Sequence, residues 1–218
     1  QLATYSSGSG TSTLIFNYTV VAGDNSADLN YFDTASLVLP TSPAATIKDP
    51  GLNVAVLTLP ATTSGTVGNL ATNAAIVIDT TAPSAATSLA LTSVGGTVRS
   101  NTLNSTNTNF TASATITAGQ ATGGKADLLV GTTVIASDAT ILVADTSVTF
   151  DLGSTTAATL QAALAAGGSV TVKVYDLAGN VSNASTAVTL TVDYTTPSIS
   201  AFTGLATTVS SAQTISIT

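Results

Sequence analysis

The stretch SVTVKVYDLAGN, residues 169–180, decides how this chain folds. Three valines alternate with a threonine, a lysine and a tyrosine, and the run then ends on Asp176, Gly179 and Asn180. Alternation with a period of two, in β-branched residues, predicts a strand with one buried and one wet face. Asp, Gly and Asn at its end predict a tight turn.

The same alternation recurs along the chain and predicts an all-β fold. It is found at residues 12–20, 109–116, 147–152 and 185–192, whereas only residues 156–168 have helical spacing. Many short strands separated by turns are typical of antiparallel β-sandwiches. The residues expected on one face of these strands are Leu14, Phe16, Tyr18 and Val20; Phe110, Ala112, Ala114 and Ile116; Val148, Phe150 and Leu152; Val170, Val172 and Val174; and Val188, Leu190 and Val192.

The composition excludes several classes of function. Only 7% of the 218 residues are charged, and the net charge is −7, with four basic residues against eleven acids that are all Asp. Nucleic-acid binding needs clustered Lys and Arg, which are absent. The chain has no His, Cys or Glu, which removes the usual catalytic bases and thiolate nucleophiles, so we expect no enzyme. No apolar run is long enough to span a bilayer.

Two Asp-to-Pro segments, residues 79–83 and 193–197, predict linkers, because proline stiffens a connection between modules. They divide the chain into residues 1–79, a module lacking its first strands; residues 80–193, a complete module; and residues 194–218, a linker with the first strands of a further module. The chain begins at Gln1 without a Met, which suggests a processed or excised piece of a longer product.

Each linker lies downstream of a loop in which an Asn follows an Asp by four residues. These pairs are Asp49 with Asn53 in IKDPGLNVAV and Asp176 with Asn180 in VYDLAGNVSN. In the first loop the glycine stands one place earlier and Leu52 takes its position, so we expect a different turn there. Because Asp bonds its own backbone in turns, the simplest interpretation is that these residues close turns at strand ends.

Residues 1–83 resemble the bacterial immunoglobulin-like repeats of very large surface proteins, such as calcium-dependent adhesins and S-layer-associated proteins. The matching stretches are ATYSSGSGTSTLIFNYTVVAGDNSADLNY, IKDPGLNVAVLTLP and AAIVIDTTAP. The middle of the chain is similar more loosely, through VTVKVYDLAGNVSNAS and VTLTVDYTTP. The resemblance implies tandem immunoglobulin-like sandwiches whose loop and linker residues bind Ca²⁺ near module junctions.

Ca²⁺ takes six to eight oxygen ligands, which loop carboxylates and amides supply. We therefore predict that a loop and a linker converge at one end of each module. The ligands would be Asp49, Asn53 and Asp79 in the first module and Asp176, Asn180 and Asp193 in the second, and Asp24 and Asp28 in GDNSAD would add ligands or form a separate site.

The incomplete ends of the chain have two interpretations. A module that lacks strands exposes an apolar trough, which the tail of a neighbouring copy would fill by donor-strand complementation, with Ile215 and Ile217 on the inserted face. Repetition of that contact would give a filament or lattice. The alternative is that the ends reflect excision from a longer array of repeats.

These observations predict a structural protein secreted to the bacterial cell surface. Its modules would be rigidified by Ca²⁺ at their junctions and would contact neighbouring copies or adjacent repeats, in a filament, S-layer or adhesin stalk. The alternative is an adhesin module that binds a ligand or glycan. A Lys–Asn isopeptide crosslink, with Lys48, Lys125 or Lys173 as donor, is a further possibility.

Overall fold

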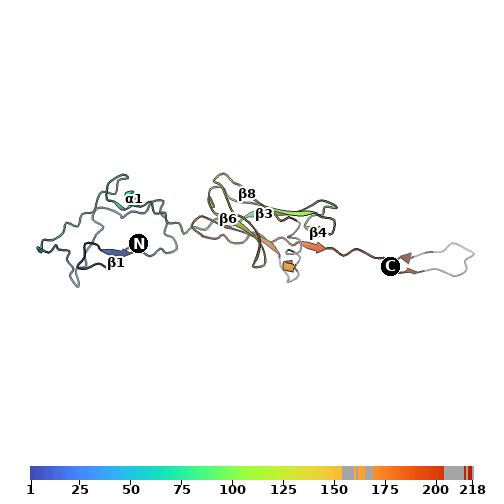
Figure 1. Ribbon diagram of the computed structural model, residues 1–218, viewed down its shortest axis with the longest axis horizontal. Coiled ribbons are helices and arrows are strands. Elements are labelled where there is room, and N and C mark those ends of the chain that lie inside the picture. Colours follow the sequence, from blue (N-terminus) through green and yellow to red (C-terminus); the bar gives the residue numbers. More distant parts are fainter. Residues whose placement is uncertain (154–159, 161, 165–168, 204–213, 215, 218) are drawn as a thin grey trace, which may run out of the picture.

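The computed structural model describes residues 1–153, 160, 162–164, 169–203, 214, 216 and 217. The protein is predominantly β, with several small antiparallel sheets and one short parallel pair. Figure 1 shows an N-terminal segment, residues 1–79, followed by a central region, residues 84–193, and a tail. No helix among the described residues is long and apolar enough to cross a membrane.

The central region contains two three-stranded antiparallel sheets. The first has the order β3 (Thr87–Val94), β5 (Asn109–Thr115) and β8 (Ser147–Asp151). The second has the order β7 (Thr133–Asp138), β6 (Lys125–Val130) and β9 (Val170–Tyr175). A turn at residues 131 and 132 joins β6 to β7, and Gly131 adopts a positive φ, 59°, there.

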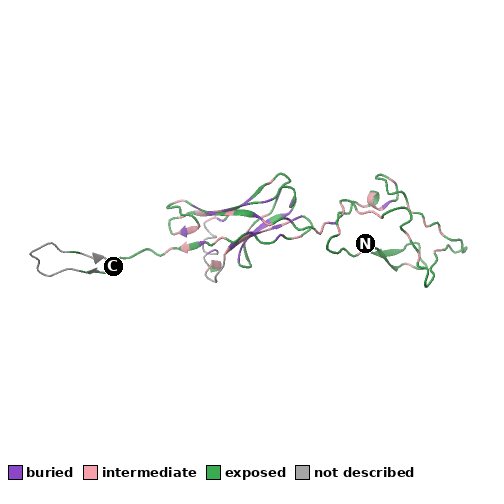
Figure 2. Ribbon diagram, turned by 180° about the vertical axis from the view of Figure 1, so that it is seen from behind, coloured by how far each residue is buried: buried purple, intermediate pink, exposed green. Residues whose placement is uncertain are grey.

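Both sheets contribute to one hydrophobic core, because successive side chains of a strand point to opposite faces. The predicted faces at residues 109–116, 147–152 and 169–176 are confirmed as buried, and Leu128 and Val130 of β6 pack with them. Figure 2 shows the buried residues concentrated in this region. Apolar burial of this kind is the main stabilising contribution to folding.

The segment after β9 runs beside that strand and pairs with it through two serines. The main-chain N–H groups of Val172 and Val174 donate to the hydroxyls of Ser185 and Ser182, each at 2.9 Å. Both serines are buried, and their own N–H groups donate back to the carbonyls of β9. The predicted strand at residues 185–192 is mostly irregular: Val188 forms an isolated bridge with Val170, and the regular part is β10 (Thr191–Asp193), which pairs in parallel with β4 (Thr102–Asn104).

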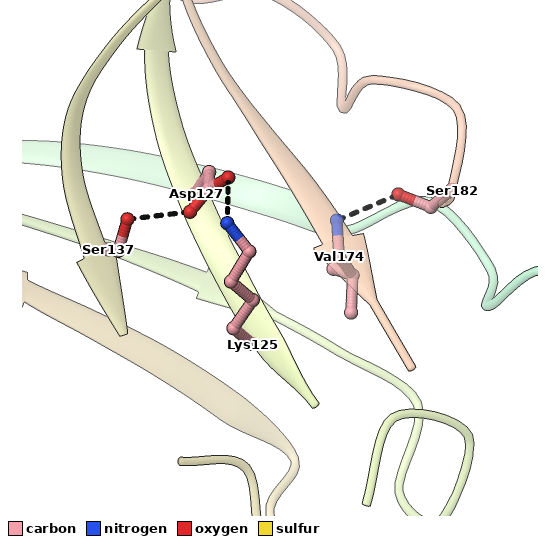
Figure 3. A network of polar contacts seen from close by, with 5 residues as sticks. All are labelled: Lys125, Asp127, Ser137, Val174 and Ser182. Carbon is pink, nitrogen blue, oxygen red and sulfur yellow. Dashed lines mark hydrogen bonds and ion pairs between the residues drawn. The ribbon is translucent and has the colours of Figure 1, made fainter. Parts of the chain in front are cut away.

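A buried carboxylate lies on the outer face of the second sheet. Asp127 of β6 is 2% exposed, and its two oxygens accept from Ser137 at 2.6 Å and from Lys125 Nζ at 2.7 Å. Figure 3 shows Asp127 between these two side chains. Lys125 Nζ also lies 4.6 Å from the ring centroid of Tyr175, across the β6–β9 pair, so its ammonium group already has two partners.

The N-terminal segment has little core of its own. Its regular elements are β1 (Thr4–Ser7), β2 (Ile15–Asn17) and the single-turn α1 (Leu70–Asn73). Only Asn69 and Ile78 are buried in residues 1–79. The prediction of a buried face at residues 12–20 is wrong: Leu14, Phe16 and Val20 are exposed, because β2 pairs only with β1 and no second sheet covers it.

Two other predictions lie partly outside the described residues. In the predicted helix at 156–168, Leu160 and residues 162–164 are helical. In the tail, β11 (Phe202–Thr203) pairs with β12 (Ser216–Ile217). Ile217 therefore belongs to a tail hairpin, and Ile215 lies outside the described residues. Strand exchange stays a prediction.

Candidate functional site

The first linker, residues 79–83, contacts a loop of the central region that follows it by about a hundred positions. Asn180 Nδ2 donates a 3.0 Å hydrogen bond to the main-chain carbonyl oxygen of Asp79. Asn180 ends the loop at residues 176–180, which directly follows β9, so the second sheet positions it. The contact joins the N-terminal segment directly to the central region.

The loop that presents Asn180 is closed by its own aspartate. Asp176 is 7% exposed, and its Oδ1 and Oδ2 accept from the Asn180 main-chain N–H and from Asn180 Nδ2, each at 2.8 Å. The main chain closes the same turn, since the N–H of Asp176 donates to the carbonyl of Asn180 at 3.1 Å. One amide proton of Asn180 thus binds Asp176, and the other is directed to Asp79.

The first linker is also held from the N-terminal side. Asn25 Oδ1 accepts from the main-chain N–H of Thr80 at 3.0 Å and from the hydroxyl of Thr81 at 3.1 Å. The Thr80 hydroxyl donates to the carbonyl of Asp24 at 3.1 Å and accepts from the N–H of Gly23 at 2.9 Å. The GDNSAD loop therefore binds the linker through the side-chain amide of Asn25 and through main-chain groups of Gly23 and Asp24.

On the central side the linker has a third anchor. Pro83 is buried, and the N–H of Ser84 donates to Gln120 Oε1 at 2.8 Å. Asn25 and Gln120 were not among the predicted site residues. Asn25 lies inside the quoted GDNSAD motif, so the sequence pointed to its loop. No neighbouring residue identifies Gln120 as a site residue, because its hydrogen-bond partner, Ser84, is 36 positions away.

The first Asp–Asn loop has the same hydrogen bonds as the second. Asn53 donates to Asp49 from its main-chain N at 2.9 Å and from Nδ2 at 2.8 Å. The expectation of a different turn is wrong, because Leu52 adopts the positive φ, 67°, that Gly179 has at the equivalent place, 90°. This conformation costs Leu52 about 1 kcal/mol in steric strain. Unlike Asn180, Asn53 is exposed.

These hydrogen bonds lower the pKa of Asp49 below its ordinary value, chiefly through the Asn53 side chain and then through main-chain N–H groups. A depressed folded-state pKa means that this stabilisation is present at neutral pH and is lost as the pH falls through that pKa, below about 4. We expect a carboxyl NMR titration of Asp49 to show a low midpoint that rises in Asn53→Ala and stays unchanged in Asn180→Ala. An ordinary midpoint in the unsubstituted protein would contradict this geometry.

The other predicted site residues are dispersed. Asp24 accepts from the N–H of Val21 and the hydroxyl of Tyr18, both at 3.0 Å, and the Val21 bond is the main cause of its lowered pKa. Asp28 lines a shallow polar hollow of about 390 Å³. Asp193 ends β10, on the side of the central region where Figure 1 labels β4, and Asp193 Oδ1 accepts from Thr195 N–H at 2.9 Å.

The structure groups these residues differently from the predicted calcium sites, because the carbonyl of Asp79 meets Asn180 of the other predicted site. Across the described ranges, no three acidic side chains approach closely enough to hold a metal ion. The Asp49 and Asp176 carboxylates already accept N–H groups, and the contact at Asp79 uses its carbonyl oxygen. The turn-closing interpretation accounts for both Asp–Asn loops without a metal ion. Calcium binding stays a prediction.

Two hollows on the surface bear on the alternative of glycan binding. The first, beside Asp28, is lined by hydroxyls, amides and small residues. The second, of about 450 Å³, lies between β4 and the second linker, residues 193–197, and includes Arg99. Neither is lined by an aromatic side chain, which is the usual platform for a sugar ring, so no observation favours this alternative.

Comparison with protein-family models, with curated proteins and with solved structures finds no match to this chain.

Proposed function

We propose that this chain is a structural protein of a bacterial surface assembly, such as a filament, S-layer or adhesin stalk. In this proposal immunoglobulin-like β-sandwich modules are joined in series outside the cell, and the protein bears load as a spacer. The observation that supports it is the hydrogen bond from Asn180 to the carbonyl of Asp79, which ties the first linker to the module that follows it.

A linker held from both sides restricts the angle between the segments that it joins. Asn25 binds Thr80 and Thr81 from one side, and Asn180 and Gln120 bind the linker and its continuation from the other. Flexible linkers leave domains free to reorient, so side-chain contacts of this kind are what a stiff array requires. The low charge suits close lateral contacts, because few ions lose water when modules pack.

We expect Asn180→Ala to loosen this joint. The variant loses one hydrogen bond at the linker, worth about 1 kcal/mol, so the unlatched population rises about fivefold. The measurement is the NMR rotational correlation time, determined separately for residues 1–79 and for residues 84–193. The two values should be equal in the unsubstituted protein and should differ from each other in the variant. The Asn180 main-chain bond to Asp176 is retained.

Asn53→Ala is the matched control, because it removes the equivalent amide from a loop that contacts no linker among the described residues. It should leave the correlation times unchanged, whereas Asn25→Ala combined with Asn180→Ala should separate them further. Independent tumbling in the unsubstituted protein would refute the stiff-spacer proposal. Repeating the experiment with Ca²⁺ and with EDTA tests the calcium prediction separately, since an ion at the joint would make tumbling depend on chelation.

A further inference from the structure

We call the loop at Asp176–Asn180 the linker receptor, because its Asn180 binds the carbonyl of Asp79 in the first linker. The loop at Asp49–Asn53 has the same structure as this receptor. In both loops the Asn donates its main-chain N–H and its Nδ2 to the same two oxygens of the Asp, at distances that agree within 0.1 Å. In both loops the N–H of the Asp donates to the carbonyl of the Asn at 3.1 Å.

The strands that flank the two loops agree as well. Isolated antiparallel bridges join Lys48 to Val54 and Tyr175 to Val181, one residue outside each Asp–Asn pair. The left-handed residue precedes the Asn in both loops, even though Leu52 adopts that conformation less readily than glycine. Agreement of side-chain bonds, main-chain bonds and turn conformation makes the two loops equivalent as hydrogen-bond donors.

The linkers form a matching pair. Asp79 Oδ1 accepts from the N–H of Thr81 at 2.9 Å, and Asp193 Oδ1 accepts from the N–H of Thr195 at 2.9 Å. In the first linker this turn fixes the backbone next to the Asp79 carbonyl, which accepts the hydrogen bond from Asn180. Because the receptor binds a main-chain oxygen, the replacement of Thr80 by Tyr194 in the second linker does not remove the acceptor.

Among the residues that the structure describes, one receptor, at Asn180, is engaged with one linker, at Asp79. Asn180 uses both amide protons, one on Asp176 and one on Asp79, and it is half-buried. Asn53 uses one, on Asp49, and is exposed with its second amide proton unused within the described part of the chain. Asp193, the counterpart of Asp79, pairs with Asn104 in the β10–β4 ladder, so its carbonyl offers a second receptor its remaining lone pair.

We propose that Asn53 receives the main-chain carbonyl of Asp193 from a second copy of this chain placed ahead of it in series. The occupant of the Asp49–Asn53 loop is thus the second linker of the preceding copy, in the register that pairs Asp79 with Asn180 within one chain. This inference rests on the proposed function, and it specifies the joint: each linker is latched by an Asn of the unit that it leads into.

The proposed contact requires copies that are held next to one another by a covalent connection or by other contacts. A single hydrogen bond contributes about 1 kcal/mol, which is far below the cost of bringing two free chains together. A covalent connection supplies an effective concentration of about millimolar, so the same bond becomes sufficient to bias the joint. The test therefore uses a tandem fusion in which residue 218 of one full chain is joined to residue 1 of another.

The chain has no cysteine, so introduced thiols can be cross-linked without background. In the single chain, Ala82→Cys with Val181→Cys is the reference joint, because both positions are exposed and Asn180 is retained. In the tandem, Thr196→Cys in the first copy is combined with Val54→Cys in the second, at the equivalent positions and with Asn53 retained. A short bis-maleimide is added, and the linked peptides are identified by mass spectrometry. We expect the tandem pair to link to the same extent as the reference pair.

The register control places Thr196→Cys and Val54→Cys in the first copy of the tandem, where the two residues belong to opposite junctions. This control should lose the intramolecular product. If the reference pair links but the tandem pair does not, the further inference is overturned and the proposed function stands. If the reference pair fails to link, the joint between Asp79 and Asn180 is absent, and both proposals fail. Equal linking in the tandem and in the control would also overturn the inference, because it would indicate nonspecific encounter.

Discussion

Phe110→Ala lowers the free energy of unfolding of the central region by about 3–5 kcal/mol, whereas Phe32→Ala changes it by less than about 0.5 kcal/mol. Phe110 is 2% exposed and packs in the core that the two sheets share, so its removal costs both transfer free energy and a cavity. Phe32 is 93% exposed, and its truncation uncovers nothing. The pair compares one residue type in two environments.

The measurement is equilibrium urea unfolding followed by far-ultraviolet circular dichroism, because the chain has no tryptophan to report by fluorescence. The midpoint should fall strongly for Phe110→Ala and stay in place for Phe32→Ala, with the slope unchanged in both. Comparable losses at the two positions would mean that residues 1–79 possess a core as substantial as that of the central region, contrary to their exposure.

Asp127→Ala lowers the free energy of unfolding by about 2 kcal/mol, because it removes two hydrogen bonds to a buried carboxylate, one of them from the charged Lys125. Asp127 is 2% exposed, and both Lys125 and Ser137 donate to it. Lys125 is about half exposed and regains water when its partner is lost, which keeps the effect below that of breaking a fully buried ion pair.

Asp138→Ala is the matched control, since Asp138 lies on the adjacent strand and accepts only a 3.4 Å contact from Thr140 N–H. Its truncation should cost less than about 0.5 kcal/mol. Ser137→Ala, which removes one donor and leaves the ion pair intact, should fall between the two. Urea midpoints of the three variants test this order. An Asp127→Ala protein as stable as the Asp138→Ala protein would show that the buried carboxylate contributes nothing to stability.

Much of the central region could be predicted from the sequence. The alternating runs at residues 109–116, 147–152 and 169–176 became β5, β8 and β9 with the predicted faces buried. The same alternation failed at residues 12–20, because amphipathicity specifies which face can be buried but not whether another layer is present to bury it. The run at 185–192 lost regularity because its first residue, Ser185, accepts the Val172 N–H through its hydroxyl rather than through a carbonyl, and Val188 forms only an isolated bridge with β9.

The candidate site was predicted in part. Asp49, Asn53, Asp176 and Asn180 form the two loops that their spacing indicated, because an Asp four residues before an Asn can close its own turn. The predicted grouping assigned Asp79 to the first loop and Asp193 to the second. Instead, Asp79 contacts Asn180 of the following region. Spacing along the chain identifies a linker and a loop, but it does not say which loop a linker meets.

The sequence by itself determined the local features: which runs are strands, where turns close, and which carboxylates bind their own backbone. These depend on φ and ψ preferences and on partners within about five residues. Only the tertiary structure decided that Asp127 is buried and that Asn180 reaches Asp79, 101 positions earlier. Contacts over that distance follow from how the sheets pack as a whole, and no local pattern encodes them.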